Sequence, residues 1–284
     1  MPASATPPSA SDHAAQIEAW RAGRIARLTA PDGWLSLVGL HWLSEGANTI
    51  GSDAGNDIVI EGTPPRLGRI ELAGGKARLE LDPAAREARI DGSQQRSALL
   101  RDDASESPTL VVSGTTSFYL VERNGRYGLR VKDSNAKTRT DFAGIDSFPI
   151  DPAWRVEAKW VPFDPPHELE VPNVLGQVDR FPVPGKAVFE RDGRTFELLP
   201  VVEEPGAKEL FLIFADRTSG KETYGAGRFL YAPMPENGRI VLDFNKAYNP
   251  PCAFTPYATC PLAPPENRLD VRVTAGERKY GSGH

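Results

Sequence analysis

The sequence predicts a nearly all-β protein in which one amphipathic helix precedes two β domains. Three observations support this fold class. Short apolar runs recur at roughly ten-residue intervals after residue 33, the spacing expected of successive strands. The 26 glycines and 26 prolines supply many turns. A helical repeat of apolar residues occurs in one segment near the N-terminus.

Length and charge restrict the kind of protein. A chain of 284 residues is long enough for two modest domains. The net charge of -5, with both signs interspersed, provides neither a basic stripe for nucleic acid nor a polybasic patch for anionic lipid. No apolar run resembles a signal peptide or approaches the ~20 residues of a membrane helix. We expect a cytoplasmic protein without a nucleic-acid or membrane partner.

The N-terminal part is expected to be a disordered tail followed by a helix. Residues 1–10 are rich in Pro, Ala and Ser, a composition typical of disorder. Residues 11–30 carry apolar residues at helical spacing, Asp12 can cap this helix, and Pro31-Asp32-Gly33 ends it. The expected apolar stripe is Ile17, Trp20, Ile25 and Leu28.

Residues 31–145 are expected to form a β sandwich. The clearest hairpin has Asn124-Gly125 between two apolar runs, because both positions tolerate a positive φ. Gly74-Gly75 and Asp91-Gly92 mark further turns. The expected strands are residues 34–38, 48–50, 57–60, 68–72, 76–81, 87–90, 109–112, 116–123 and 126–132.

Residues 146–284 are expected to form a second antiparallel β domain, a barrel or a sandwich. Its first strand, residues 154–161, alternates as a half-buried strand should, and the prolines of residues 162–166 end it. Asp192-Gly193 and Asn237-Gly238 are expected hairpin turns. The further strands are residues 168–171, 176–181, 185–191, 194–200, 210–215, 228–232 and 239–243.

The segment from Tyr224 to Arg268 is the expected location of a functional site. After residue 243 the strand pattern gives way to a long proline-rich loop. Long loops without secondary structure are uncommon in compact domains and are often functional. The prolines hold the backbone extended, so the polar side chains between them are pre-positioned.

Arg228, Asp243 and Asn245 form one candidate constellation in this segment. Asp243 and Asn245 are two residues apart, so their side chains share a face, and Arg228 can converge on the carboxylate if the two strands pair. This arrangement suits a substrate clamp or a general acid–base site. It suits equally a buried Arg–Asp pair that pins the loop to the sheet.

Cys252 and Cys260 allow four interpretations: two buried apolar residues, a nucleophilic thiol, a redox disulfide, or metal ligation. Cys252 is the better nucleophile candidate, because Tyr248 and Asn249 lie close in sequence and can orient a base or stabilise an oxyanion. Tyr224 precedes a Gly-x-Gly that lacks the following helix of a dinucleotide site.

The histidines and the common motifs add little to these candidates. His41 lies in an apolar segment and is expected to be a core histidine rather than a base for Cys252. His13 and His167 occur in polar or proline-rich contexts. The four histidines show no paired spacing, so no His-based metal site is expected. The motifs of common hydrolases, kinases and metalloproteases do not occur.

Five motifs carry a family resemblance: GLHWLSEGANTIG (39–51), RYGLRVKD (126–133), FPIDPAWRVEA (148–158), DRTSGKETYGAGRF (216–229) and DFNKAYNPPCAFTPYATCPLAPPEN (243–267). Together they strongly resemble the bacterial family known as domain of unknown function 1684. The resemblance extends from residue 15 onward, and its last motif is highly specific. It implies family membership without implying an activity.

A second resemblance concerns the first β domain. Residues 49–52, 55–60 and 68–70 look like the opening strands of a forkhead-associated β sandwich, a reader of phosphothreonine peptides. Ser52 stands where that family has its phosphate-binding Arg, and residues 64–68 replace its Ser-x-x-His turn. The resemblance therefore implies the sandwich without the phosphopeptide function.

Two functions from different classes follow from these candidates. The first is an enzyme acting on a small polar or anionic molecule, and the second is a non-catalytic ligand-binding or protein-interaction module. The sequence points to no particular cofactor, metal or oligomeric state. In the first hypothesis the catalytic residues are Asp243, Cys252 and Arg228, and the substrate-binding residues are Asn245, Tyr248, Asn249 and Tyr224.

Overall fold

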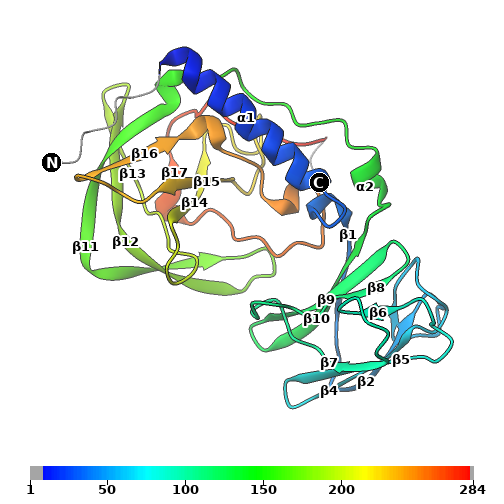
Figure 1. Ribbon diagram of the computed structural model, residues 1–284. Helices are drawn as coiled ribbons and strands as arrows, with labels where there is room; N and C mark the ends of the chain where they lie inside the picture. The colour runs from blue at the N-terminus through cyan, green and yellow to red at the C-terminus, as the bar shows by residue number, and fades with distance from the viewer. Residues whose placement is uncertain (1–8, 282–284) are drawn as a thin grey trace. The chain divides into compact units, whose positions relative to one another are not determined.

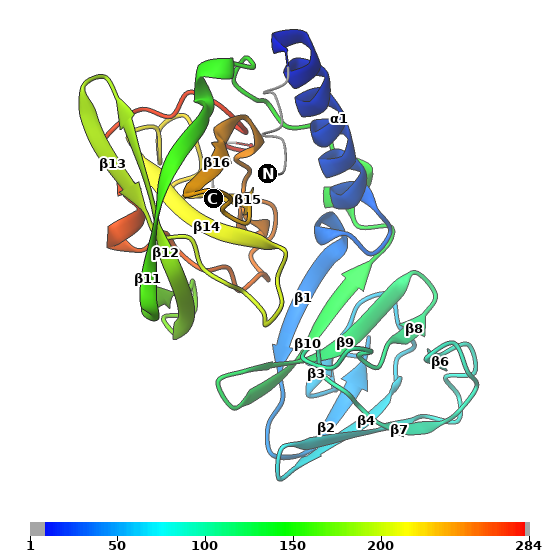
Figure 2. The same ribbon diagram turned by 60° about the vertical axis from the view of Figure 1, so that its left-hand side comes forward.

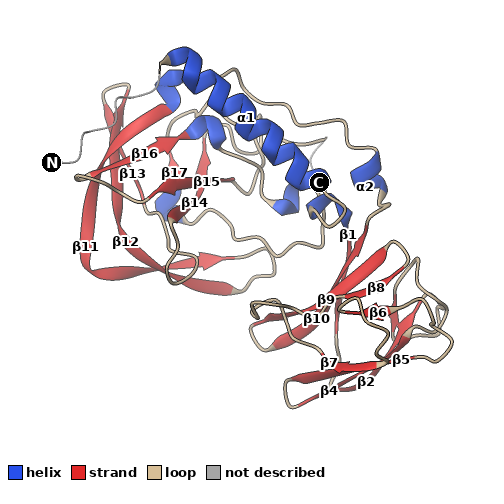
Figure 3. Cartoon of the chain, viewed as in Figure 1, coloured by secondary structure: helices blue, strands red, loops and turns tan. Residues whose placement is uncertain are grey.

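The computed structural model describes residues 9–281 and is built mostly of strands (Figures 1 and 3), so the predicted all-β class with one N-terminal helix is confirmed. The chain forms two compact units. Of the described residues, the sandwich unit comprises 27–142 and 255–258, and the C-terminal unit comprises 9–26, 143–254 and 259–281. The predicted tail lies outside the described residues as far as residue 8.

Helix α1 spans Ala10–Thr29. Ser9, rather than the expected Asp12, caps it: the Ser9 hydroxyl accepts the Asp12 N–H at 3.2 Å and donates to the Asp12 carboxylate at 2.6 Å. One face of the helix is buried, but Ile25 of the expected stripe is 38% exposed. The buried positions are His13, Ile17, Arg24 and Leu28. Two polar residues therefore continue the apolar stripe.

The sandwich unit contains two five-stranded sheets around one core (Figure 2). The core alternates apolar residues from both sheets, including Ile50, Ile70, Phe118 and Leu129. One sheet is β1 (Leu37–Trp42), β10 (Arg126–Asp133), β9 (Thr116–Arg123), β8 (Val111–Ser113) and β6 (Arg89–Ile90). The other is β3 (Ile58–Val59), β2 (Gly46–Gly51), β4 (Gly68–Ala73), β5 (Lys76–Leu81) and β7 (Ser97–Leu99). Short helices η1 (Trp34–Ser36) and α2 (Lys137–Thr140) flank these strands.

The predicted hairpin turns form as expected. Asn124 has φ of 52° and Gly125 of 79°, and Arg123 pairs with Arg126 across this two-residue turn. Asp192 and Asn237 also have positive φ and are each followed by a glycine of positive φ. Only residues that tolerate the left-handed region fit such turns without strain.

The C-terminal unit contains two sheets. The first has the order β13 (Arg194–Leu198), β12 (Val178–Arg191), β11 (Arg155–Pro172) and β16 (Arg239–Asp243), and the second the order β15 (Arg228–Pro233), β14 (Glu209–Asp216) and β17 (Arg268–Leu269). Facing residues of the two sheets form one core together with Phe244, which follows β16 and whose ring meets that of Phe214 edge to face at 5.4 Å. Figure 1 shows β11 and β12 curving around this core.

The prediction that the prolines of residues 162–166 end a strand is wrong. Strand β11 runs on to Pro172, with a register shift between Pro162 and His167. Proline is tolerated at a bulge or on an edge, where its missing N–H is not needed. β16 pairs only with residues 155–159 of β11, so the later part has β12 on one side only.

The proline-rich segment after β16 contains short 3₁₀ turns. They are η3 (Phe244–Lys246), η4 (Pro251–Ala253) and η5 (Pro265–Asn267); a similar turn, η2 (Pro152–Trp154), precedes β11. Within residues 9–281, no helix has the length and apolar composition needed to cross a membrane.

His41 predicts a pH dependence of stability. Burial lowers the pKa of His41 on β1 below its ordinary value of 6.5. As the pH falls below about 6.5, the unfolded chain binds the proton first, so the free energy of unfolding should decrease. The free energy of unfolding of wild type and His41→Gln is measured by urea unfolding between pH 8 and 5. Equal profiles for wild type and His41→Gln would contradict the prediction.

Candidate functional site

The seven residues predicted to form a site lie in four separate groups of contacts within the C-terminal unit. Arg228 pairs with Asp216, and Asp243 and Asn245 contact His13 and Asp151. Tyr248 and Asn249 surround Arg24, while Tyr224 and Cys252 lie beside Cys260. Their catalytic and binding roles stay predictions.

Arg228 does not bind Asp243 as expected; it forms a buried ion pair with Asp216. Arg228 Nη2 lies 2.7 Å from Asp216 Oδ2, and the two side chains are 1% and 0% exposed. Arg228 also donates to the carbonyl oxygens of Val273 and Ala275. Burial lowers the pKa of Arg228 and the charge of Asp216 opposes that shift. This guanidinium holds the segment from residue 273 against β14 and β15.

Asp243 instead binds His13 of helix α1. His13 Nε2 lies 2.7 Å from Asp243 Oδ2, while Asp243 Oδ1 accepts the side-chain amide of Asn245 at 3.0 Å. Asn245 also exchanges hydrogen bonds with the backbone of Asp151. His13 and Asp243 are 3% and 9% exposed. The pair therefore fastens the start of α1 to the end of β16.

Tyr248 and Asn249 belong to a third group around Arg24. The guanidinium of Arg24 lies 4.6 Å from the Tyr248 ring centre and donates to Glu277 and to the Asn249 carbonyl oxygen. The second Glu277 oxygen accepts the Asn249 N–H at 2.7 Å. Burial raises the pKa values of Tyr248 and Glu277, and Arg24 opposes both shifts. The group fixes the later part of α1.

Cys252 and Cys260 form the fourth group together with Tyr224. The Cys252 N–H donates to Cys260 Sγ at 3.1 Å, and the Cys260 N–H donates to Cys252 Sγ at 3.3 Å. Burial, and then the charges of the two sulfurs, raise the pKa of Tyr224. The phenol therefore interacts electrostatically with both cysteines.

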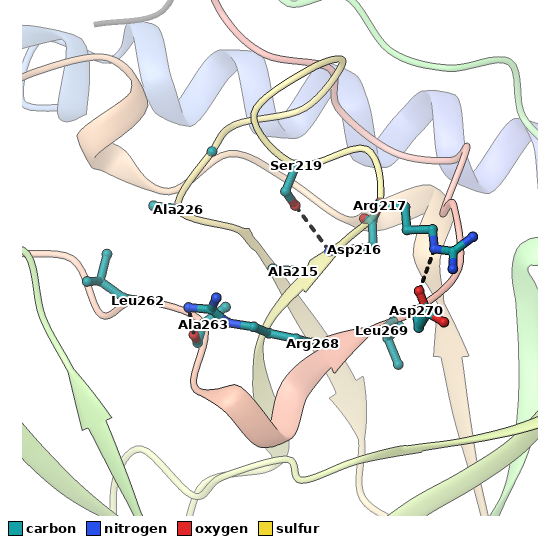
Figure 4. A pocket seen from close by; sticks show the side chains of 11 residues that line it. Ala215, Asp216, Arg217, Ser219, Ala226, Leu262, Ala263, Arg268, Leu269 and Asp270 are labelled. Carbon is teal, nitrogen blue, oxygen red and sulfur yellow. Dashed lines mark hydrogen bonds and ion pairs between the residues drawn. The ribbon is translucent and has the colours of Figure 1, made fainter.

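A pocket of about 740 Å³ opens next to these groups and is lined by none of the seven predicted residues (Figure 4). Pockets of ~300–1,000 Å³ are typical of small-molecule sites. Its walls are the end of β14 with the loop after it, and the segment that enters β17. The polar lining residues are Asp216, Arg217, Ser219, Arg268 and Asp270, and the others are Ala215, Gly225, Ala226, Leu262, Ala263 and Leu269.

Both carboxylates that line this pocket are paired with arginines. Asp216 is neutralised by Arg228, and Asp270 lies 2.6 Å from Arg194 and also binds Arg217. These two arginines lower the pKa of Asp270 through their hydrogen bonds. Among residues 9–281, no carboxylate pairs with Arg268, whose guanidinium makes a 3.4 Å contact with the Ala263 carbonyl oxygen (Figure 4). Arg268 therefore leaves an uncompensated positive charge at the pocket.

Sequence reasoning missed His13 and most of the polar pocket residues. The signal for His13 and Arg24 was their spacing, since both fall in register with Ile17 and Leu28 on one helix face. Asp216 is two residues beyond Phe214, which pairs with Arg228, so it projects to the same side. Arg268 lies at the end of the segment singled out above. Among the described residues, no group of three or more His, Cys, Asp or Glu side chains is arranged to hold a metal ion.

The Arg228–Asp216 pair predicts a large stability effect. Arg228→Met should lower the free energy of unfolding by about 3–5 kcal/mol, because it leaves Asp216 buried without its partner. The double variant with Asp216→Leu should lose less than the sum of both single variants. Urea unfolding measures the cycle. Arg239→Met, which breaks the exposed pair with Glu157, is the control and should cost under ~1 kcal/mol. Additive effects in the cycle would contradict the coupling.

His13→Ala should lower the free energy of unfolding by about 1–3 kcal/mol, because the Asp243 carboxylate loses a buried hydrogen bond. Glu18→Ala removes a side chain that is 64% exposed on the same helix and should have little effect. Thermal and urea unfolding compare the two variants. Equal stabilities would show that the His13–Asp243 contact does not hold the helix.

Three comparisons with known proteins complement this geometry. No curated protein gives a match. The chain is similar to the solution NMR structure of an uncharacterized protein from gene locus rrnAC0354 of Haloarcula marismortui, with 33% identity over 49% of this chain and 78% of that chain, and a TM-score of 0.42. A structure from an analysis of phosphothreonine-dependent FHA domain interactions shares 17% identity over 33% of this chain and 92% of that chain, with a TM-score of 0.22.

The family comparison concerns the C-terminal part of the chain. The family model described as protein of unknown function (DUF1684) matches residues 140–278. The match contains all seven predicted site residues and the whole lining of the pocket. Residues before 140 lie outside it. Through residues 140–278, the chain belongs to the DUF1684 family.

Proposed function

We propose that the C-terminal unit is a binding module for a small molecule that combines an anionic group with an apolar body. The observation that carries this proposal is the position of Arg268 at a pocket of about 740 Å³. An arginine presents several N–H donors in a plane, which suits a carboxylate or a phosphate. Because Arg268 has no carboxylate partner among the described residues, an anion can bind it without displacing one.

The remaining lining defines the rest of the ligand. Five apolar side chains face the pocket, and they favour an alkyl or aryl body next to the anionic group. These side chains belong to Ala215, Ala226, Leu262, Ala263 and Leu269. Ser219 adds a hydroxyl group, whose oxygen accepts the Asp216 N–H at 3.1 Å. The hydroxyl proton is then directed to another acceptor, such as an oxygen atom of the ligand.

Binding suits this pocket better than catalysis does. Both of its carboxylates are held by arginines, and neither is positioned to accept a proton from a substrate. The three residues expected to be catalytic, Asp243, Cys252 and Arg228, do not line it. Asp243 and Arg228 are buried and hydrogen-bonded. The proposal therefore follows the non-catalytic alternative and assigns these side chains no chemical step.

The proposal predicts that anions bind and neutral analogues of the same shape do not. Benzoate, phenyl phosphate and hexanoate are compared with benzamide and hexanamide by thermal shift and by isothermal titration calorimetry. Arg268→Gln should weaken binding of the anions about tenfold or more, a loss of ~1.4 kcal/mol or greater, because a charged hydrogen bond is removed.

Arg180→Gln is the matched control. Arg180 is an exposed arginine of the same unit, paired with Glu170 on β11, and is not among the residues that line the pocket. Its substitution should leave the affinity for each anion unchanged. Equal weakening by both variants, or equal binding of benzoate and benzamide, would overturn the proposed site.

A further inference from the structure

The two cysteines of the C-terminal unit face each other across reciprocal hydrogen bonds. Each backbone N–H donates to the sulfur of the other residue, at 3.1 Å to Cys260 Sγ and 3.3 Å to Cys252 Sγ. Both are present as thiols in this structure. A backbone N–H aimed at sulfur stabilises the thiolate, which is the reactive form in disulfide exchange.

The local backbone keeps this geometry in place. Pro250 and Pro251 precede Cys252, which lies in the 3₁₀ turn η4, and Pro261 follows Cys260. The Val174 N–H donates to the Cys260 carbonyl oxygen, and Asn173 forms a bridge with Pro261. Both cysteine-bearing segments are therefore restrained by their neighbours, and the fold itself keeps the two sulfurs close together.

The two sulfurs differ in their access to solvent. Cys260 is only 5% exposed, whereas Cys252 is half-buried. An accessible thiol beside a buried one suits disulfide exchange, because the first can meet the incoming disulfide and the second can resolve the adduct.

We propose that Cys252 and Cys260 form a redox-active dithiol site that exchanges with small-molecule disulfides. This inference does not depend on the proposed ligand pocket. It selects the redox use from the four interpretations of the cysteines, because reciprocal N–H donors and unequal exposure serve exchange directly. Two buried apolar residues would need neither feature.

The exchange proceeds in two steps. The Cys252 thiolate attacks one sulfur of a disulfide R–S–S–R, a bond forms between Cys252 Sγ and that sulfur, and R–S⁻ leaves and takes up a proton. The Cys260 thiolate then attacks Cys252 Sγ, the intramolecular disulfide forms, and the second R–S⁻ leaves and is protonated. The protein loses two electrons and two protons, and the small disulfide is reduced to two thiols.

The test uses the full chain and glutathione disulfide as the probe. Reduced protein is equilibrated at a series of ratios of glutathione to glutathione disulfide, quenched with acid and weighed intact by mass spectrometry. Wild type should lose the mass of two hydrogen atoms as the ratio falls and regain it on adding excess dithiothreitol. Cys260→Ser should accumulate one glutathione adduct at Cys252, and Cys252→Ser should react at least about tenfold more slowly because its remaining thiol is buried.

Three outcomes would overturn the proposal: wild type that keeps both thiols at every ratio, wild type that stops at a glutathione adduct, or single variants that react at equal rates. Thermal melts check that the serine variants fold. If either variant is unfolded, wild type is instead quenched at short times, and peptide mapping identifies which cysteine carries the first glutathione adduct. An adduct at Cys252 supports the assignment, and an adduct at Cys260 contradicts it.

Discussion

The buried guanidinium of Arg228 is the interaction on which the C-terminal unit depends. It joins β15 to Asp216 at the end of β14 and to the carbonyl oxygens of Val273 and Ala275. A charge removed from water costs several kcal/mol, so such a site is stable only when all of its acceptors are in place. One side chain thus requires three separate segments to assemble together. The segment of residues 273–281, which has almost no regular secondary structure, acquires its conformation from this requirement.

The same constraint reaches the helix and the pocket. Glu277 follows the carbonyl groups held by Arg228, and its carboxylate is thereby placed to receive Arg24 of α1 and the Asn249 N–H. Arg228 also holds the Asp216 side chain in place as part of the pocket wall. The polar groups of the unit therefore have two uses. Those that are buried and paired define the architecture, and Arg268, at the open side of the same architecture, is left for a ligand.

The elements of the fold with strong local signals were predictable, and the long-range pairings were not. Asn124-Gly125 predicts its hairpin because a two-residue turn needs residues that accept positive φ. The helix α1 was predictable from the helical spacing of its apolar residues. The prolines of residues 162–166 misled the prediction, because their compatibility with β11 depends on which neighbours the strand has. The proline-rich segment after β16 was correctly predicted to be irregular, but the partner of Arg228 depends on the pairing of β14 with β15. His13 was overlooked because it follows polar residues in the sequence, and only its position on the buried face of α1 shows that it is a core residue.

The pairing of α1 with residues distant in sequence has a consequence for folding during translation. His13 and Arg24 leave the ribosome early, yet their acceptors, Asp243 and Glu277, are synthesised near the opposite end of the described sequence. The strands of the sandwich core all lie between residues 37 and 133, so they are available for folding long before that. During translation, the buried face of α1 therefore lacks these partners while the strands of the sandwich are being synthesised. The helix is made before both β units and docks only when the second is nearly complete.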